Sequence, residues 1–178
     1  MATPPKQPRL GWAESAAQNL LRNEEIFSPA VPIEELLEQY ADINTFYIPD
    51  RSPFCCEQDS VWQAYLNMTQ PPGELHYEEA KLLGHLLLHH LEYDVETLTD
   101  EQLGLLNCEA DCFADCVTMP APWVLDACPH GRINQADIEK LSELFSVSHK
   151  AMVQRLHELR LYAPEDFNDS YKSPWAKK

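Results

Sequence analysis

The chain reads Ala80-Lys-Leu-Leu-Gly-His-Leu-Leu-Leu-His89 near its middle, which is typical of a helix with one face in a core. Residues four apart lie about 40° apart around a helix, so Lys81, His85 and His89 form one stripe. Zinc peptidases use this spacing as His-Glu-x-x-His, with two imidazoles on the metal and the Glu as general base. Here His85 matches the second His, while Lys81 and Leu82 stand at the first His and the Glu. A protonated Lys81 has no lone pair for a metal, and Leu82 cannot accept a proton.

A second polar pattern follows in the segment Asn107-Cys-Glu-Ala-Asp-Cys-Phe-Ala-Asp-Cys-Val-Thr-Met-Pro120. On a helix, Glu109, Cys112 and Cys116 share one stripe at positions i, i+3 and i+7. Glu109 is therefore the natural third ligand beside a His on a neighbouring helix. The chain has no Cys-x-x-Cys pair of the kind that zinc sites use, so we interpret the cysteines first as small core residues.

These two segments resemble the ImmA/IrrE family of metallopeptidase-like regulators, which occur in mobile elements and bacterial stress responses. The family pattern is approximately A-H-E-L-G-H-x-L-L-H, then E-A-N-x-F-A-x-x-L-L-M-P. Two further family segments, F-x-V-S and R-L-x-x-L, match Phe145-Ser-Val-Ser148 and Arg155-Leu-His-Glu-Leu159 in the same order. The opening Val31-Pro-Ile-Glu-Glu-Leu-Leu also fits. The resemblance therefore extends over roughly residues 12–162.

The resemblance implies a small zincin-like domain of the α+β class, mostly helical with a short sheet of about three strands. It also implies a metal held by two His and one Glu, with His85 and Glu109 at ligand positions. Lys81 and Leu82 depart from the family pattern at the first ligand and at the catalytic base. This departure argues against both zinc binding and proteolysis, and Glu78 is a weak substitute for the base.

Three interpretations of this remnant site stay open at the level of the sequence. In the first, Lys81 pairs with Glu109 and its ammonium replaces the metal. In the second, zinc is bound by a rearranged set drawn from His85, His89, Glu109 and Cys112. In the third, His85 and Glu109 are hydrogen-bonded, half-buried polar residues. We expect zinc to be absent or weakly bound.

Hydrophobic periodicity and turn residues predict the elements around this site. Helices are expected near residues 12–21, 33–40 and 74–91, from Thr99 to before Pro120, and in a region covering 138–159. Thr99-Asp-Glu-Gln102 is a capping box. Strands are expected at residues 45–48 and 61–68, with a loop at 50–59. We expect a flexible segment at residues 1–10, one domain at 11–162, and a flexible tail at 163–178.

The charge balance limits the classes of partner. The 178 residues include 29 acidic and 13 basic side chains, which gives a formal net charge of −16. Such a surface repels nucleic acid and anionic membranes, and it favours basic proteins. Residues 132–162 contain five Lys or Arg against four Asp or Glu, whereas a DNA-binding segment has a clear excess of basic residues. We therefore expect no direct binding of nucleic acid and no membrane contact.

The first residues lack the apolar core of a signal peptide, and no apolar run reaches the ~18 residues that a membrane span needs. We therefore expect a cytoplasmic protein with reduced thiols. By resemblance, relatives act on helix-turn-helix repressors of mobile elements, some by cleavage and some as antirepressors. This favours a pseudoenzyme of a prophage or mobile element that binds such a repressor, or another basic protein.

Two other functions stay open. The first is an active zinc-dependent metallo-endopeptidase that cleaves a repressor through a remodelled site. The second is a metal-binding or redox module built on Cys108, Cys112 and Cys116, whose thiols metal would protect from alkylation.

Overall fold

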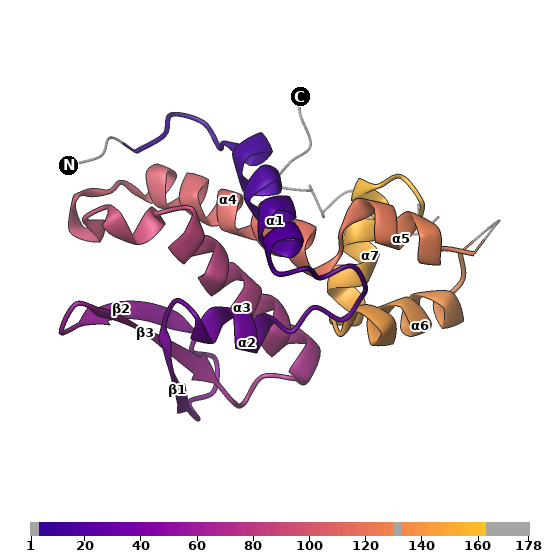
Figure 1. Cartoon of the computed structure of the whole chain (residues 1–178), viewed down its shortest axis with the longest axis horizontal. Helices are drawn as coiled ribbons and strands as arrows, with labels where there is room; N and C mark the ends of the chain where they lie inside the picture. Colours follow the sequence, from indigo (N-terminus) through magenta and orange to yellow (C-terminus); the bar gives the residue numbers. More distant parts are fainter. Residues whose placement is uncertain (1–3, 130–132, 163–178) are drawn as a thin grey trace.

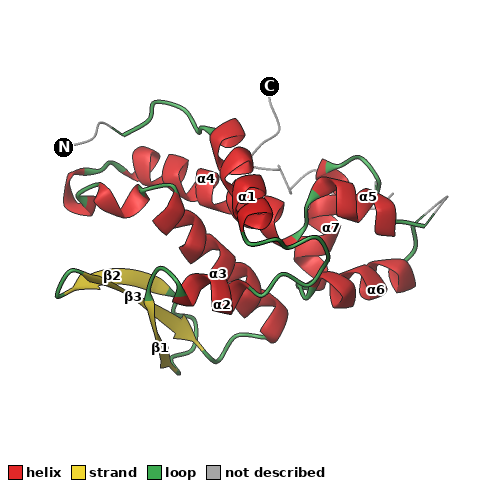
Figure 2. Ribbon diagram, in the orientation of Figure 1, coloured by secondary structure: helices red, strands yellow, loops and turns green. Residues whose placement is uncertain are grey.

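The computed structural model describes residues 4–129 and 133–162, in which helices pack against a small sheet (Figures 1 and 2). The helices are α1 (Leu10–Asn23), α2 (Ile33–Glu38), α3 (Pro72–Leu87), α4 (Asp100–Thr118), α5 (Ala121–Ala127), α6 (Gln135–Phe145) and α7 (His149–Glu158). Two 3-10 turns, η1 (His90–Glu92) and η2 (Val95–Thr97), join α3 to α4. This arrangement confirms the predicted small α+β domain. The predicted tail at 163–178 lies outside the described residues.

The sheet has the order β1-β3-β2, with β1 (Asp42–Phe46), β2 (Phe54–Gln58) and β3 (Val61–Asn67). The central strand β3 pairs parallel with β1 and antiparallel with β2. The prediction of a loop over residues 50–59 was wrong in its second half, where β2 lies. Asp59 and Ser60 connect β2 to β3 and both have positive φ, 51° and 64°. Such φ values suit a tight hairpin, but glycine, the usual sequence signal for them, is absent from this turn.

The termini of α4 confirm the sequence prediction. The hydroxyl of Thr99 accepts a hydrogen bond from the backbone N–H of Gln102, and the Gln102 side chain accepts one from the backbone N–H of Thr99. This capping box satisfies two polar groups that a helix start leaves unpaired. α4 ends at Thr118, two residues before Pro120. None of the helices in the described ranges has the length and apolar character needed to cross a membrane.

A close contact between α3 and α4 brings the two halves of the predicted site together. A Cβ placed on Gly84 would lie 2.9 Å from the ring of Phe113, so the absence of a side chain lets the two helices approach. His85 follows Gly84 on α3, and Glu109 lies on α4 one turn before Phe113. The packing of α3 against α4 therefore determines how far His85 lies from Glu109.

α3 ends earlier than its periodicity predicts, and this changes which histidine enters the core. The pattern predicts helix to Leu91, but α3 ends at Leu87 and His89 adopts a left-handed conformation with φ of 54°. The chain then turns into η1, which buries His90. The His89 side chain stays 66% exposed. The predicted stripe of Lys81, His85 and His89 therefore ends at His85.

The buried apolar residues form two hydrophobic clusters. The main cluster joins α1, α2, α3, α4 and the sheet. The second cluster joins α5, α6 and α7. The side chains of Tyr77 on α3 and Trp123 on α5 pack against both clusters. The polar network described next lies among α1, α3, η1 and α4, beside the main cluster.

Candidate functional site

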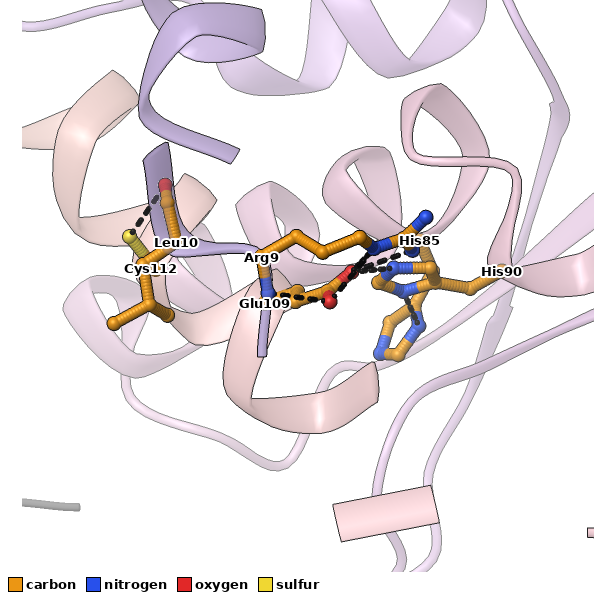
Figure 3. A network of polar contacts seen from close by, with 6 residues as sticks. All are labelled: Arg9, Leu10, His85, His90, Glu109 and Cys112. Atoms are coloured by element: carbon orange, nitrogen blue, oxygen red, sulfur yellow. Dashed lines mark hydrogen bonds and ion pairs between the residues drawn. The ribbon is translucent and has the colours of Figure 1, made fainter. Parts of the chain in front are cut away.

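Glu109 on α4 is the centre of a buried polar network (Figure 3). Its side chain has no exposed surface. Oε1 accepts hydrogen bonds from the backbone N–H of Arg9 at 2.7 Å and from Arg9 Nε at 2.9 Å. Oε2 accepts from Arg9 Nη2 at 2.7 Å and from His90 Nε2 at 2.9 Å. Donors from this chain therefore engage both carboxylate oxygens.

Two histidines extend the network from Glu109 to α3. His90 Nδ1 lies 3.0 Å from His85 Nδ1. Burial lowers the pKa of His90, and burial together with the neighbouring His90 lowers the pKa of His85 to about 3. Both rings are therefore neutral, so His90 donates from Nε2 to Glu109 and accepts on Nδ1 from His85.

The charges of Arg9 and Glu109 stabilise each other. Burial opposes ionisation of Glu109, but the hydrogen bonds from Arg9 and His90 outweigh it and lower the pKa of Glu109 below its usual value. The same hydrogen bond raises the pKa of Arg9. The two groups therefore form an ion pair. The Arg9 guanidinium also lies 4.1 Å from the ring centroid of Trp12, a cation–π contact.

Lys81 does not contact Glu109 in the described structure. Its ammonium lies 3.0 Å from Asp111 Oδ1 and 3.8 Å from Glu78 Oε1. The interpretation in which Lys81 pairs with Glu109 was therefore wrong. Asp111 is the residue of α4 that pairs with Lys81. Glu109 instead accepts hydrogen bonds from Arg9 and His90.

The position of the general base is apolar in structure as well as in sequence. Leu82 is 7% exposed and belongs to the main hydrophobic cluster. Glu78, the weak substitute for the base, is paired with Lys81, and burial raises the pKa of its carboxyl. Glu78 lies two turns of α3 before His85, on the turn that carries this ion pair.

The remaining predicted ligands, His89 and Cys112, are hydrogen-bonded to groups other than His85 and Glu109. His89 Nδ1 lies 2.9 Å from Glu92 Oε1 near the surface. The Cys112 thiol donates to the backbone carbonyl of Leu10 at 3.7 Å (Figure 3). Within residues 4–129 and 133–162, no three or more His, Cys, Asp or Glu side chains form a group that could hold a metal ion. The four predicted ligands therefore do not assemble into one site.

The arrangement around Glu109 does not fit the zinc that the resemblance implies. A zinc ion needs lone pairs from deprotonated ligands. The lone pairs of Glu109 already accept from a guanidinium, and an ammonium occupies the first-ligand position at Lys81. A divalent cation at this carboxylate would have to displace Arg9.

The cysteine stripe on α4 agrees with core packing for two of its three members. Cys112 and Cys116 are half-buried and pack against the main hydrophobic cluster. The neighbouring Cys116 together with burial raises the pKa of Cys112, while the pKa of Cys116 is lowered beside Cys112 and Arg155. Arg155 Nη2 lies 3.9 Å from Cys116 Sγ. All six cysteines are free thiols.

Arg9 and His90, both central to the network, were missed by sequence reasoning. Arg9 is 100 positions from Glu109 and lies in the segment expected to be flexible, so no local pattern links the two. His90 sits one residue after His89 and enters the site because α3 ends before it. No local signal in the sequence pointed to His90, because the residues after Leu87 are as compatible with a continued helix as with a turn.

Comparisons with known proteins agree with this architecture. The family model described as the IrrE N-terminal-like domain (peptidase M78) matches residues 56–157, more than half of the chain. A solved Mycobacterium tuberculosis transcriptional regulator has a TM-score of 0.59 at 17% sequence identity, with 82% of this chain and 46% of that chain covered. The chain therefore spans about half the length of that regulator, and the likeness is one of fold. No curated protein sequence gives a significant match.

Proposed function

Because the chain belongs to the IrrE N-terminal-like domain family, we propose that it is a regulatory protein that binds a helix-turn-helix transcriptional repressor without cleaving it. The proposal includes a prophage or other mobile element as the genetic setting and the cytoplasm as the place of action.

The proposal that the chain does not cleave its partner rests on the residues around Glu109. Peptide hydrolysis at a metal site needs an activated water and a base within hydrogen-bonding reach. Leu82 at the position of the base is buried and apolar. Glu109 already accepts hydrogen bonds from Arg9 and His90 on both oxygens. These features favour binding over hydrolysis.

The charge of the chain supports a basic partner. A DNA-binding protein carries basic side chains that contact phosphates, and the net charge of this chain is −16. Opposite charges speed association and help to select the partner. The fold shared with a transcriptional regulator is compatible with a role in transcriptional control.

A binding measurement at two salt concentrations tests the proposal. We expect the purified chain to bind the helix-turn-helix regulator encoded beside it, with Kd about tenfold weaker in 500 mM than in 50 mM NaCl, because salt screens exposed charges. The matched control is an unrelated DNA-binding domain of equal net charge, which should bind more weakly. Absence of binding at both salt concentrations would contradict the proposal.

The same mixture tests the alternative of an active zinc-dependent metallo-endopeptidase. We expect the regulator to remain full length during incubation with added zinc and with a chelator. Cleavage that stops with the chelator, and that is lost in Glu109→Gln, would replace the binding proposal with the peptidase.

A further inference from the structure

We infer that Arg9, whose side chain is 36% exposed, supplies to the buried Glu109 a cation in place of the metal of this family's site and holds the start of α1 against α4. The resemblance implies a metal beside Glu109, and the donor set described above does not fit one. Arg9 precedes the matched residues 56–157, so neither the family motif nor its match assigns this role.

The geometry of Arg9 suits this role. Its backbone N–H, Nε and Nη2 all donate to Glu109, at 2.7, 2.9 and 2.7 Å. Nε and Nη2 form a planar fork that meets both carboxylate oxygens, the strongest arrangement for an arginine–carboxylate pair. A metal would need the same oxygen lone pairs, so Arg9 and a metal exclude each other.

Burial explains why a cation is needed here. An unpaired carboxylate inside a protein is costly, and Glu109 has no exposed surface. The ammonium of Lys81, the nearest cation on α3, is paired with Asp111 at 3.0 Å. Among the described residues, Arg9 therefore supplies the positive charge in contact with Glu109.

Three further contacts hold this segment in place. The Arg9 guanidinium lies over the ring of Trp12 at 4.1 Å, and Trp12 meets the ring of His90 edge-on with centroids 6.5 Å apart. The Cys112 thiol donates to the carbonyl of Leu10. The last residues before α1 and its first turn are thus bound to both α4 and η1. These contacts hold the start of α1 in place whether or not the chain binds a repressor.

A double-mutant cycle tests the inference without any activity assay. We expect Arg9→Met to lower Tm by about 6 °C, because it leaves the buried carboxylate of Glu109 without its guanidinium partner. Adding Glu109→Gln to Arg9→Met should recover about half of that loss, because the buried charge is then gone. Arg22→Met, on the exposed end of α1, is the matched control and should change Tm by less than about 1 °C. Losses that simply add in the double variant would overturn the inference.

Metal content provides the second measurement. The purified parent chain should contain no stoichiometric zinc, and neither zinc nor a chelator should shift its Tm. Arg9→Lys keeps a cation but loses the fork, so its Tm should fall between those of the parent and Arg9→Met. Near-stoichiometric zinc in the parent that disappears in Glu109→Gln would overturn the inference.

Discussion

Two buried carboxylates illustrate how the surroundings of one residue set its charge. Glu109 is fully buried but ionised, because Arg9 and His90 donate to it. Glu79 on α3 is 5% exposed, and burial together with the nearby charge of Glu34 raises the pKa of its carboxyl to about 7. The same residue type is therefore charged at one position and close to half-protonated at the other at neutral pH.

Glu79 is expected to make stability fall as pH rises. Its pKa in the folded chain lies above the ordinary value of 4.5, so the unfolded chain loses the proton first and stability is lost between about pH 4.5 and about pH 7. Glu79→Gln should therefore stabilise the protein by roughly 2 kcal/mol at pH 8 and by much less near pH 5. Urea unfolding at both pH values measures this difference. Glu35→Gln, an exposed change of the same charge on α2, is the control, and an equal effect of both variants would contradict the prediction.

Residue-level prediction from the sequence succeeded in part at this site. The chain pattern placed His85 and Glu109 on two helices, and the structure joins them through His90. One of its three interpretations named Lys81 as the partner of Glu109, whereas the ion pair of Glu109 is with Arg9. Helical spacing reports which residues share a face, but it carries no information on a contact between positions 100 residues apart.

At the scale of elements, the contact between α3 and α4 depends on one small residue. A Cβ at Gly84 would lie 2.9 Å from Phe113 Cδ1 and 3.2 Å from its Cβ, and the Phe113 Cβ cannot move without its helix. We expect Gly84→Ala to destabilise the protein by about 2 kcal/mol, because extra volume in a packed core forces strain. Chemical denaturation measures this loss.

Gly104 on α4 is the matched control for Gly84. A Cβ at Gly104 would meet no atom within 4 Å. Gly104→Ala should therefore leave stability unchanged or raise it by about 0.5–1 kcal/mol, because alanine favours helix more than glycine. Equal effects of the two substitutions would show that α3 and α4 are not in close contact at Gly84.

The elements themselves were predicted where local chemistry signals them. The capping box at Thr99 and the hydrophobic spacing of α1, α4 and α6 are local features, and the structure confirms them. The hairpin of β2 and β3 was missed because Asp59 and Ser60 adopt positive φ without glycine. The end of α3 was missed because Leu88, His89, His90 and Leu91 are apolar or neutral, so helix and turn are equally compatible with them.

At the scale of the whole molecule, Tyr77 connects the two hydrophobic clusters. Its ring packs against both, and its hydroxyl donates to Asp115 Oδ1 at 3.0 Å and lies 3.3 Å from the carbonyl of Asp111. Asp115 is 3% exposed, and burial raises the pKa of its carboxyl well above the usual value. The clusters therefore share a buried polar contact as well as apolar surface.

Tyr77→Phe is expected to destabilise the whole domain and to loosen its second cluster. Removing the hydroxyl leaves Asp115 without this donor, which should cost about 1–3 kcal/mol. Amide hydrogen exchange in α6 and α7 should accelerate more than in β3. Tyr47→Phe, at a side chain that is 72% exposed, is the control and should change neither quantity. Uniform exchange changes across all elements would instead indicate one cooperative core.

The sequence by itself determined the family, the α+β class, most helices, and the placement of His85 and Glu109 on neighbouring helices. The helices and the placement of these two residues follow from local spacing, capping and turn chemistry, which act over a few residues, whereas the family and the class follow from the resemblance of the motifs. Tertiary structure decided that Arg9 faces Glu109, that His90 replaces His89, and that Lys81 turns to Asp111. Those choices depend on how the start of α1, the end of α3 and the face of α4 meet in space. A buried charge is costly unless an opposite charge or hydrogen-bond donors lie beside it in space, and such partners can come from distant positions in the chain.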